Sequence, residues 1–381
     1  MIFIVRFPTL LCAAVAGSLL LAAGSVRSEE SVRSEETEQR RQTLVRSGLK
    51  YLADQGQSDS GMFSDRVGPG VTALVITASL RNGMSPTDPM VTKSLDALEK
   101  FIRPDGGVYG NGRLKNYETC VAIVAFAEAN TGGQYNDVLG KAKDFVTEMQ
   151  YGVGDRASSD RWYGGASYDG SGRPDLSNTA YLIEALRSLE TPAEDPAMQA
   201  ALAFVSRSQN LASKYNDTEF ADKVNDGGFY YLVPSTKVDP STTDEQFTAN
   251  GGLRSYGSMT YTGLKSMIFA GLTPEDRRVK AAVQWVTDHY DVSSNPGMGS
   301  AGLFYYYHTF AAGLSAAGVD KLTDAEGTQR DWRSDLVNEL SNRLNEDGSW
   351  QNQNERWFEN DKNLSTAFAL MALAHARPMA E

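Results

Sequence analysis

The chain has 381 residues, which is enough for one large domain or two ordinary ones, and its formal net charge is -12 at pH 7. Hydrophobic residues make up 41% and charged residues 22%, an ordinary globular balance. The acidic balance argues against nucleic acid as a partner. The two cysteines, Cys12 and Cys120, provide no disulfide framework, because Cys12 lies in a predicted leader.

The first residues have the layout of a secretory signal peptide. One positive charge lies in residues 1–6, an apolar run covers residues 10–23, and small residues end that run. We therefore expect residues 1–24 to be cleaved and the mature protein to be secreted or periplasmic. The alternative is a retained membrane anchor, because the uncharged residues 7–26 approach the roughly 20 residues that a membrane span requires.

A polar duplication follows this leader. The sequence Ser-Val-Arg-Ser-Glu-Glu occurs twice within residues 25–36. It is too polar to bury apolar area, so we expect residues 25–38 to form a flexible linker. Residues 39–381 are expected to form a single domain.

Six units of similar form follow one another along that domain. In each unit an amphipathic helix leads, through a turn rich in glycine and aromatic residues, into a helix that is apolar on most sides. The apolar helices are expected to begin near Thr72, Thr119, Thr179, Thr260, Tyr305 and Thr366. The amphipathic helices are expected at residues 44–55, 91–102, 138–150, 198–209, 279–290 and 336–344. This alternation predicts two helical layers, an inner ring and an outer ring.

Parts of the repeat resemble the QW motif of squalene–hopene cyclases. The segments that end at Gln150 and Gln209 resemble its glutamine half, and residues 347–350 (Asp-Gly-Ser-Trp) resemble its tryptophan half. The resemblance covers residues 40–378 and extends to protein prenyltransferase β-subunits. It implies an all-α fold, an α/α-toroid of about six inner and six outer helices around a central cavity.

The cyclases that the chain resembles protonate an alkene with the central aspartate of an Asp-x-Asp-Asp-Thr-Ala motif. This chain has Asp-Leu-Ser-Asn-Thr-Ala at residues 175–180, so Ser177 stands where the acid belongs. A serine hydroxyl is too weak an acid for this step. We therefore expect Asp175 and Ser177 to cap a helix.

The prenyltransferases bind zinc through Asp-x-Cys on one inner helix and a histidine on the next. Here His308 takes the place of the histidine, but Tyr256 and Ser258 stand where the aspartate and the cysteine belong. One histidine cannot hold zinc, because zinc sites use three or more protein ligands. We expect no metal and no other cofactor, and we expect His308 to face the cavity, hydrogen-bonded to a tyrosine or to a backbone group.

Tyrosines gather near the starts of the fourth and fifth apolar helices, and a tyrosine suits a pocket wall as well as a core. Side chains three or four residues apart share a helix face, so Tyr305 and His308 lie together and Tyr307 points elsewhere. The resemblance of His308 to the cavity-facing histidine of the prenyltransferases implies that Tyr305 and His308 face the cavity and Tyr307 the core. The expected ligand-binding residues are Tyr256, Tyr261, Tyr305, His308 and Trp162.

Carboxylates also lie near the starts of the apolar helices, and some toroids cleave polysaccharides with paired carboxylates. These carboxylates belong to Glu118, Asp160, Asp169, Asp175, Asp226 and Glu355. The candidates for catalysis are Asp175, Glu118 and His308. Cys120 lacks the Cys-Gly-Glu-Gln sequence of thioester proteins that share this toroid, and it is expected to be a small core residue.

These features favour a protein that binds an apolar or isoprenoid-like molecule, or an extended segment of a partner, in its central cavity. Peripheral contact with a membrane is compatible with such a ligand. One alternative is an enzyme that acts on an isoprenoid, and a second is a polysaccharide-cleaving toroid with paired carboxylates. A structural role outside the cell is the simplest alternative.

Overall fold

The fold is all-α, as the repeat predicts. The computed structural model describes residues 12–152, 158–234 and 246–378, and those residues contain twelve α-helices. The strands found in the same residues are β1 (Leu322–Thr323) and β2 (Gln329–Arg330), which form one short antiparallel hairpin. Within the described residues, no helix combines the length and the apolar character that crossing a membrane requires.

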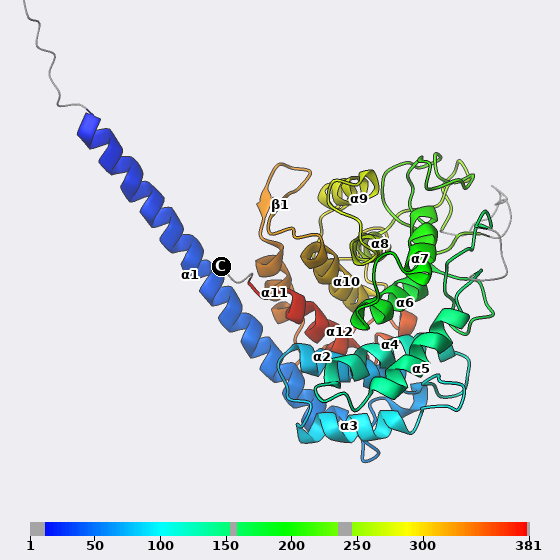
Figure 1. The fold of residues 1–381 in the computed structure, drawn as a ribbon. Helices are drawn as coiled ribbons and strands as arrows, with labels where there is room; N and C mark the ends of the chain where they lie inside the picture. Colours follow the sequence, from blue (N-terminus) through cyan, green and yellow to red (C-terminus); the bar gives the residue numbers. More distant parts are fainter. Residues whose placement is uncertain (1–11, 153–157, 235–245, 379–381) are drawn as a thin grey trace, which may run out of the picture.

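Six helices of the described residues form the inner ring (Figure 1). They are α2 (Gly70–Arg81), α4 (Lys115–Ala129), α6 (Leu176–Ser188), α8 (Gly257–Phe269), α10 (Leu303–Ala316) and α12 (Lys362–His375). Each packs against the next, and α12 packs against α2, so the ring is closed. Their starts lie within four residues of the predicted ones, which confirms the predicted inner helices.

The other six helices lie outside this ring. They are α1 (Cys12–Tyr51), α3 (Pro89–Glu99), α5 (Asn136–Glu148), α7 (Pro196–Arg207), α9 (Arg277–Asp288) and α11 (Trp332–Asn342). An aspartate begins α3, α7 and α9 in the same way: Asp88, Asp195 and Asp276 each accept a hydrogen bond from a backbone N–H of the first turn. The predicted amphipathic helices are thereby confirmed, and the chain is an α/α-toroid.

A threonine of the inner helix secures the preceding turn in five of these units. Its hydroxyl accepts a hydrogen bond from a backbone N–H that burial would otherwise leave unpaired. The bonds run from Phe63 to Thr72 (2.9 Å), Val108 to Thr119 (3.0 Å), Ala166 to Thr179 (3.0 Å), Phe229 to Thr260 (3.1 Å) and Trp350 to Thr366 (3.0 Å). The recurring threonines therefore have a structural role: each joins the start of an inner helix to the turn before it.

Glutamines at the ends of outer helices join consecutive units. The Gln150 amide donates to the carbonyls of Gly164 (2.8 Å) and Ala197 (2.9 Å). Gln209 repeats the arrangement with Gly227 and Arg278, at 2.9 Å each. In both cases one side chain holds the end of an outer helix, the following turn and the first turn of the next outer helix.

The N-terminal segment differs from the prediction. Residues 25–38, expected to be a flexible linker, are helical and belong to α1, which extends away from the toroid (Figure 1). These residues are rich in glutamate and arginine, which favour helix, and contain no glycine or proline. Near its C-terminal end α1 packs against α11 and α12. The predicted leader lies partly outside the described residues, which begin at residue 12.

Candidate functional site

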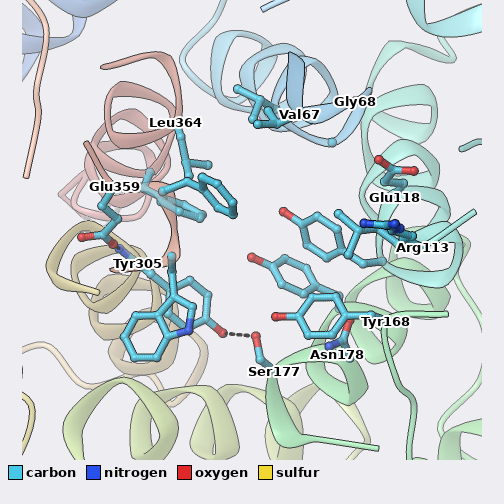
Figure 2. A pocket seen from close by; sticks show the side chains of 18 of the residues that line it. Val67, Gly68, Arg113, Glu118, Tyr168, Ser177, Asn178, Tyr305, Glu359 and Leu364 are labelled. Atoms are coloured by element: carbon cyan, nitrogen blue, oxygen red, sulfur yellow. Dashed lines mark hydrogen bonds between the residues drawn. The ribbon is translucent and has the colours of Figure 1, made fainter. Parts of the chain in front are cut away.

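A cavity of about 620 Å³ opens where the inner helices begin (Figure 2). Every inner helix contributes to its wall. The contributing residues include Val71 of α2, Tyr117 of α4, Ser177 of α6, Met259 of α8, Tyr305 of α10 and Phe368 of α12. The cavity is therefore centred on the axis of the toroid, at the N-terminal ends of the inner helices.

The cavity wall is mainly aromatic. Six tyrosines of the described residues line it: Tyr117, Tyr168, Tyr181, Tyr231, Tyr256 and Tyr305. A continuous row of ring contacts runs along the wall, with centroid separations of 6.1 Å for Tyr168 and Tyr117, 5.1 Å for Tyr117 and Tyr181, 6.5 Å for Tyr181 and Tyr305, and 5.6 Å for Tyr305 and Phe368. These separations are typical of favourable aromatic pairs.

Two long segments between helices, which we call the first and the second insertion, bring Tyr168 and Tyr231 to the cavity. The first insertion lies between α5 and α6, and the second lies between α7 and α8. The Tyr168 carbonyl accepts a hydrogen bond from the backbone N–H of Asn116 (3.0 Å), at the start of α4. The Tyr231 carbonyl accepts one from Leu176 (2.9 Å), at the start of α6. Each insertion therefore satisfies a backbone donor at the N-terminal end of an inner helix.

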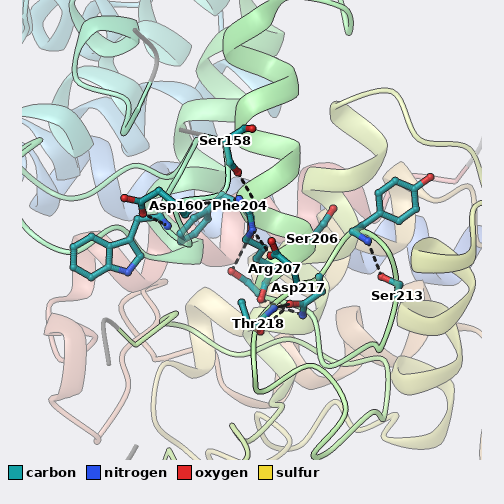
Figure 3. Close-up of polar contacts among 12 residues, drawn as sticks. Ser158, Asp160, Phe204, Ser206, Arg207, Ser213, Asp217 and Thr218 are labelled. Carbon is teal, nitrogen blue, oxygen red and sulfur yellow. Dashed lines mark hydrogen bonds and ion pairs between the residues drawn. The ribbon is translucent and has the colours of Figure 1, made fainter. Parts of the chain in front are cut away.

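Arg207, at the end of α7, fastens both insertions (Figure 3). Its guanidinium donates to the backbone carbonyls of Ser158 (2.7 Å) and Asp160 (3.3 Å) in the first insertion, and pairs with Asp217 (2.9 Å) in the second. The Arg207 side chain is largely buried, which strengthens such charge-assisted hydrogen bonds. Arg207 is therefore a structural residue that positions part of the cavity wall.

The carboxyl group of Glu118 lies in the cavity wall, is buried, and has a hydrogen-bond partner at one of its two oxygens. The residue is only 3% exposed, and its Oε2 accepts a hydrogen bond from the Gly110 backbone N–H (2.9 Å). Burial raises the pKa of this carboxyl above its ordinary value. Its Oε1 makes no hydrogen bond or ion pair with any residue that the structure describes. Glu118 is thus the catalytic candidate that the structure places on the cavity.

Asp175 lies outside the cavity lining. It is buried, and its two carboxyl oxygens accept hydrogen bonds from the backbone N–H (2.8 Å) and the side-chain amide (2.7 Å) of Asn178. Burial raises the pKa of Asp175 to about 6. Asp175 is the N-cap of α6, as expected. Ser177 is not a cap: its hydroxyl lies on the cavity, 2.9 Å from the hydroxyl of Tyr305.

Two expected ligand-binding residues lie elsewhere in the molecule. Tyr261 is fully buried in the core, with its ring 5.0 Å from Phe310. It lies five residues after Tyr256, so it points to a different side of α8. Trp162, which belongs to the first insertion, packs in a separate hydrophobic cluster, with its indole N–H on the Val233 carbonyl (2.9 Å). Tyr256 and Tyr305, by contrast, line the cavity as expected.

His308 also lies outside the cavity lining, one turn deeper than Tyr305. It stacks on Phe368, with ring centroids 5.9 Å apart, and its Nδ1 has no hydrogen-bond partner among the described residues. Among the described residues, the Nδ1 atom of His308 therefore does not make the expected hydrogen bond to a tyrosine or to the backbone. Burial lowers the pKa of His308 well below its ordinary value.

His308 belongs to a charged group near the other end of the axis, which we call the axial charge cluster. Each inner helix contributes one member: Arg81, Glu128, Glu184, Lys265, His308 and His375. Glu184 pairs with Lys265 (2.6 Å) and Arg81 (3.1 Å). Burial alone would raise the pKa of Glu184, but these two cations lower it.

The zinc chemistry of prenyltransferases does not fit these residues. His308 has the Lys265 ammonium and His375 as neighbours, whereas Tyr256 and Ser258 line the cavity at the other end of α8. A cation disfavours a second cation beside it. Over the described ranges, no group of three or more histidine, cysteine, aspartate or glutamate side chains has the arrangement of a metal site.

Sequence reasoning missed the segment that closes one side of the cavity. Glu359 is buried, and its carboxylate accepts hydrogen bonds from the Tyr305 backbone N–H (2.8 Å) and from the Asn352 amide (2.7 Å). Trp357 and Phe358 line the cavity, although they are 45% and 67% exposed. Both have left-handed backbone conformations, with φ of 57° and 64°. The only signal in the sequence was an aromatic pair within a polar segment.

Two concentric helical rings with a cavity on their axis define the class of terpenoid cyclase/prenyltransferase-like toroids. A family comparison agrees: the family model of the squalene-hopene cyclase C-terminal domain matches residues 46–235, about half of the chain. The chain belongs to the squalene-cyclase/prenyltransferase-like repeat family. No curated protein gives a significant match to the chain.

Proposed function

We propose that this protein binds an apolar, isoprenoid-like molecule in its central cavity, outside the cytoplasm. The observation that carries the proposal is the aromatic wall formed by Tyr117, Tyr181, Tyr305 and Phe368. The cavity volume of about 620 Å³ lies within the range of sites for small molecules. Burying apolar ligand surface against such a wall is favourable by about 25 cal/mol per Å².

The mouth of the cavity supports an apolar ligand. Val67, Tyr168, Trp357 and Phe358 line the cavity and are 37% to 67% exposed. Exposed apolar side chains around a concave site are typical of contact with a ligand or a lipid surface. Peripheral contact of this mouth with a membrane is part of the proposal, because it would deliver an apolar molecule without passage through water.

The extracytoplasmic location is supported by the layout of residues 1–24. If this segment is a cleaved signal peptide, mass spectrometry of the protein secreted by its host will show a chain that lacks it. An intact N-terminus on the membrane-bound protein would instead support the anchor.

The two enzymatic alternatives have less support. Asp175 is engaged as a helix cap and Ser177 is too weak an acid, so protonation of an alkene by the residues of this motif is disfavoured. Cleavage of a polysaccharide needs two available carboxyl groups. Of the two glutamates that line the cavity among the described residues, Glu118 has a free oxygen, whereas both oxygens of Glu359 are engaged.

The proposal can be tested with squalene as the apolar probe. We expect squalene to co-elute with the purified protein in gel filtration and to be recovered unchanged. Ser177→Phe should abolish co-elution because the added ring fills the cavity, whereas Gln284→Phe, on the exposed side of α9, should not. Failure of the wild-type protein to bind any apolar isoprenoid would refute the proposal, and a cyclic product would restore the enzymatic alternative.

A further inference from the structure

Contact between the carboxyl group of Glu118 and a pure hydrocarbon ligand would be unfavourable. It is buried in the cavity wall, and only its Oε2 has a partner, the Gly110 N–H. Covering a polar oxygen with hydrocarbon removes water from it and gives no hydrogen bond in return. A molecule that fills this cavity must therefore either leave Oε1 unsatisfied or bring a polar group to it.

Gly68 lies close against Oε1 of Glu118, and both residues line the cavity. Gly68 has a φ of 91°, and a Cβ atom at that position would lie 2.4 Å from Oε1. A glycine therefore permits the carboxyl group to lie where it does. Figure 2 shows Glu118 and Gly68 on the wall opposite Glu359, so the free oxygen belongs to one end of the cavity.

We propose that the ligand carries a hydroxyl group at one end, and that this hydroxyl donates a hydrogen bond to Oε1 of Glu118. The inference rests on the proposed function and narrows it from an isoprenoid hydrocarbon to an isoprenoid alcohol. The hydrocarbon part of the ligand lies along the aromatic row, and the hydroxyl lies at the end of the cavity that Glu118 and Gly68 line.

A hydroxyl suits this carboxyl group in either protonation state. An ionised carboxylate accepts from an alcohol O–H, and a protonated carboxyl group keeps a carbonyl oxygen that accepts. Burial raises the pKa of Glu118, which makes the neutral form more accessible, but recognition of the alcohol does not depend on it.

An anionic head group is the competing ligand chemistry. Arg66 and Arg113 line the mouth and make no ion pair with any described residue. Both are exposed to solvent, where salt screens their attraction for an anion. Glu118 is buried beside them and repels an anion when it is ionised. The buried group therefore favours a neutral alcohol.

The test compares farnesol with farnesene, which has a similar branched fifteen-carbon chain and lacks the hydroxyl. The measured quantity is the ratio of the farnesene Kd to the farnesol Kd. We expect this ratio to fall at least about tenfold from the wild-type protein to Glu118→Leu, which corresponds to about 1.4 kcal/mol. Comparing ratios removes the difference in water solubility between the two molecules.

Gln284→Leu, on the exposed side of α9 and outside the cavity, is the control, and its ratio should equal that of the wild-type protein. If leucine does not fit beside Gly68, Glu118→Ala makes the same comparison without added bulk. An unchanged ratio in a folded Glu118 variant overturns the inference and leaves the proposed function intact. Tighter binding of farnesyl diphosphate than of farnesol also overturns it. Binding of neither farnesol nor farnesene counts against the proposed function itself.

Discussion

The hydroxyls of Ser177 and Tyr305 lie 2.9 Å apart at the cavity, although 128 residues separate them in the sequence. This contact joins the starts of α6 and α10, which are not neighbours in the inner ring. Figure 2 shows the two side chains meeting at one end of the cavity. The position of the catalytic acid in related cyclases is thus occupied here by a group that pairs with a tyrosine.

Tyr305 and Tyr307, two residues apart on α10, should differ in their effect on stability. Tyr305 is half-buried at the cavity, whereas Tyr307 is fully buried against Phe304. We expect Tyr307→Ala to lower the free energy of unfolding by roughly 3–5 kcal/mol, as for other large core side chains. Tyr305→Ala should cost much less and should weaken binding of squalene. Urea denaturation measures the first effect; a greater loss in Tyr305→Ala would mean that the helix face is inverted.

The axial charge cluster predicts a dependence of stability on pH. Burial lowers the pKa of His308 well below 6.5 and lowers that of His375 to about 3. The unfolded chain then binds protons that the folded protein does not, so stability is full above about pH 6.5 and falls as the pH drops towards 3. The charged groups that act on these histidines are Lys265, Glu184, Arg81 and Arg377, and Glu128 pairs with Arg81.

The measurement is the slope of unfolding free energy against pH between 6.5 and 4. His375→Gln should reduce this slope by the contribution of one proton, whereas Gln284→Leu, which removes no titratable group, should leave it unchanged. Asp175 contributes to the pH dependence of stability in the opposite direction. Its pKa in the folded protein is raised to about 6, so the folded protein binds a proton before the unfolded chain does as the pH falls. The comparison therefore uses differences between variants. Equal slopes in the wild-type protein and His375→Gln would contradict the assignment.

The glutamine links between outer helices should contribute strongly to stability. Gln209 is fully buried, and Gln209→Leu removes its hydrogen bonds to the Gly227 and Arg278 carbonyls. We expect the free energy of unfolding to fall by roughly 2–4 kcal/mol, since two buried acceptors lose their partner. Gln284→Leu, on an exposed face, should change it by less than about 0.5 kcal/mol. Similar losses in both variants would show that Gln209 has no special role.

The left-handed backbone at Trp357 predicts an unusual order of stability. A left-handed conformation costs a residue with a side chain roughly 1–2 kcal/mol more than glycine. Trp357→Gly should therefore be more stable than Trp357→Ala by about 1 kcal/mol, although alanine is otherwise preferred. Thermal unfolding of the two variants measures this difference. If the alanine variant is the more stable one, the segment has relaxed and the strain is absent.

The sequence alone determined the toroid, because the features that define its repeat are local in the chain. The apolar width of each inner helix, the glycine-aromatic turn before it and the recurring threonine all lie within a single unit. The loss of the cyclase acid and of the zinc ligands is likewise a matter of residue identity at Ser177, Tyr256 and Ser258. Helical spacing separated Tyr305 from Tyr307, and the resemblance of His308 to a prenyltransferase ligand suggested which of the two faces the cavity; Tyr305 does line the cavity and Tyr307 is buried in the core.

Only the tertiary structure decided which side chains meet on the axis. Tyr168 and Tyr231 reach the cavity on long insertions, and the path of an insertion depends on distant contacts such as those of Arg207. His308 shares a face with Tyr305 but lies too deep for the cavity, because the wall ends at Phe368. The free oxygen of Glu118 could not be foreseen either, because a carboxyl group is satisfied or left open only by neighbours that folding brings together.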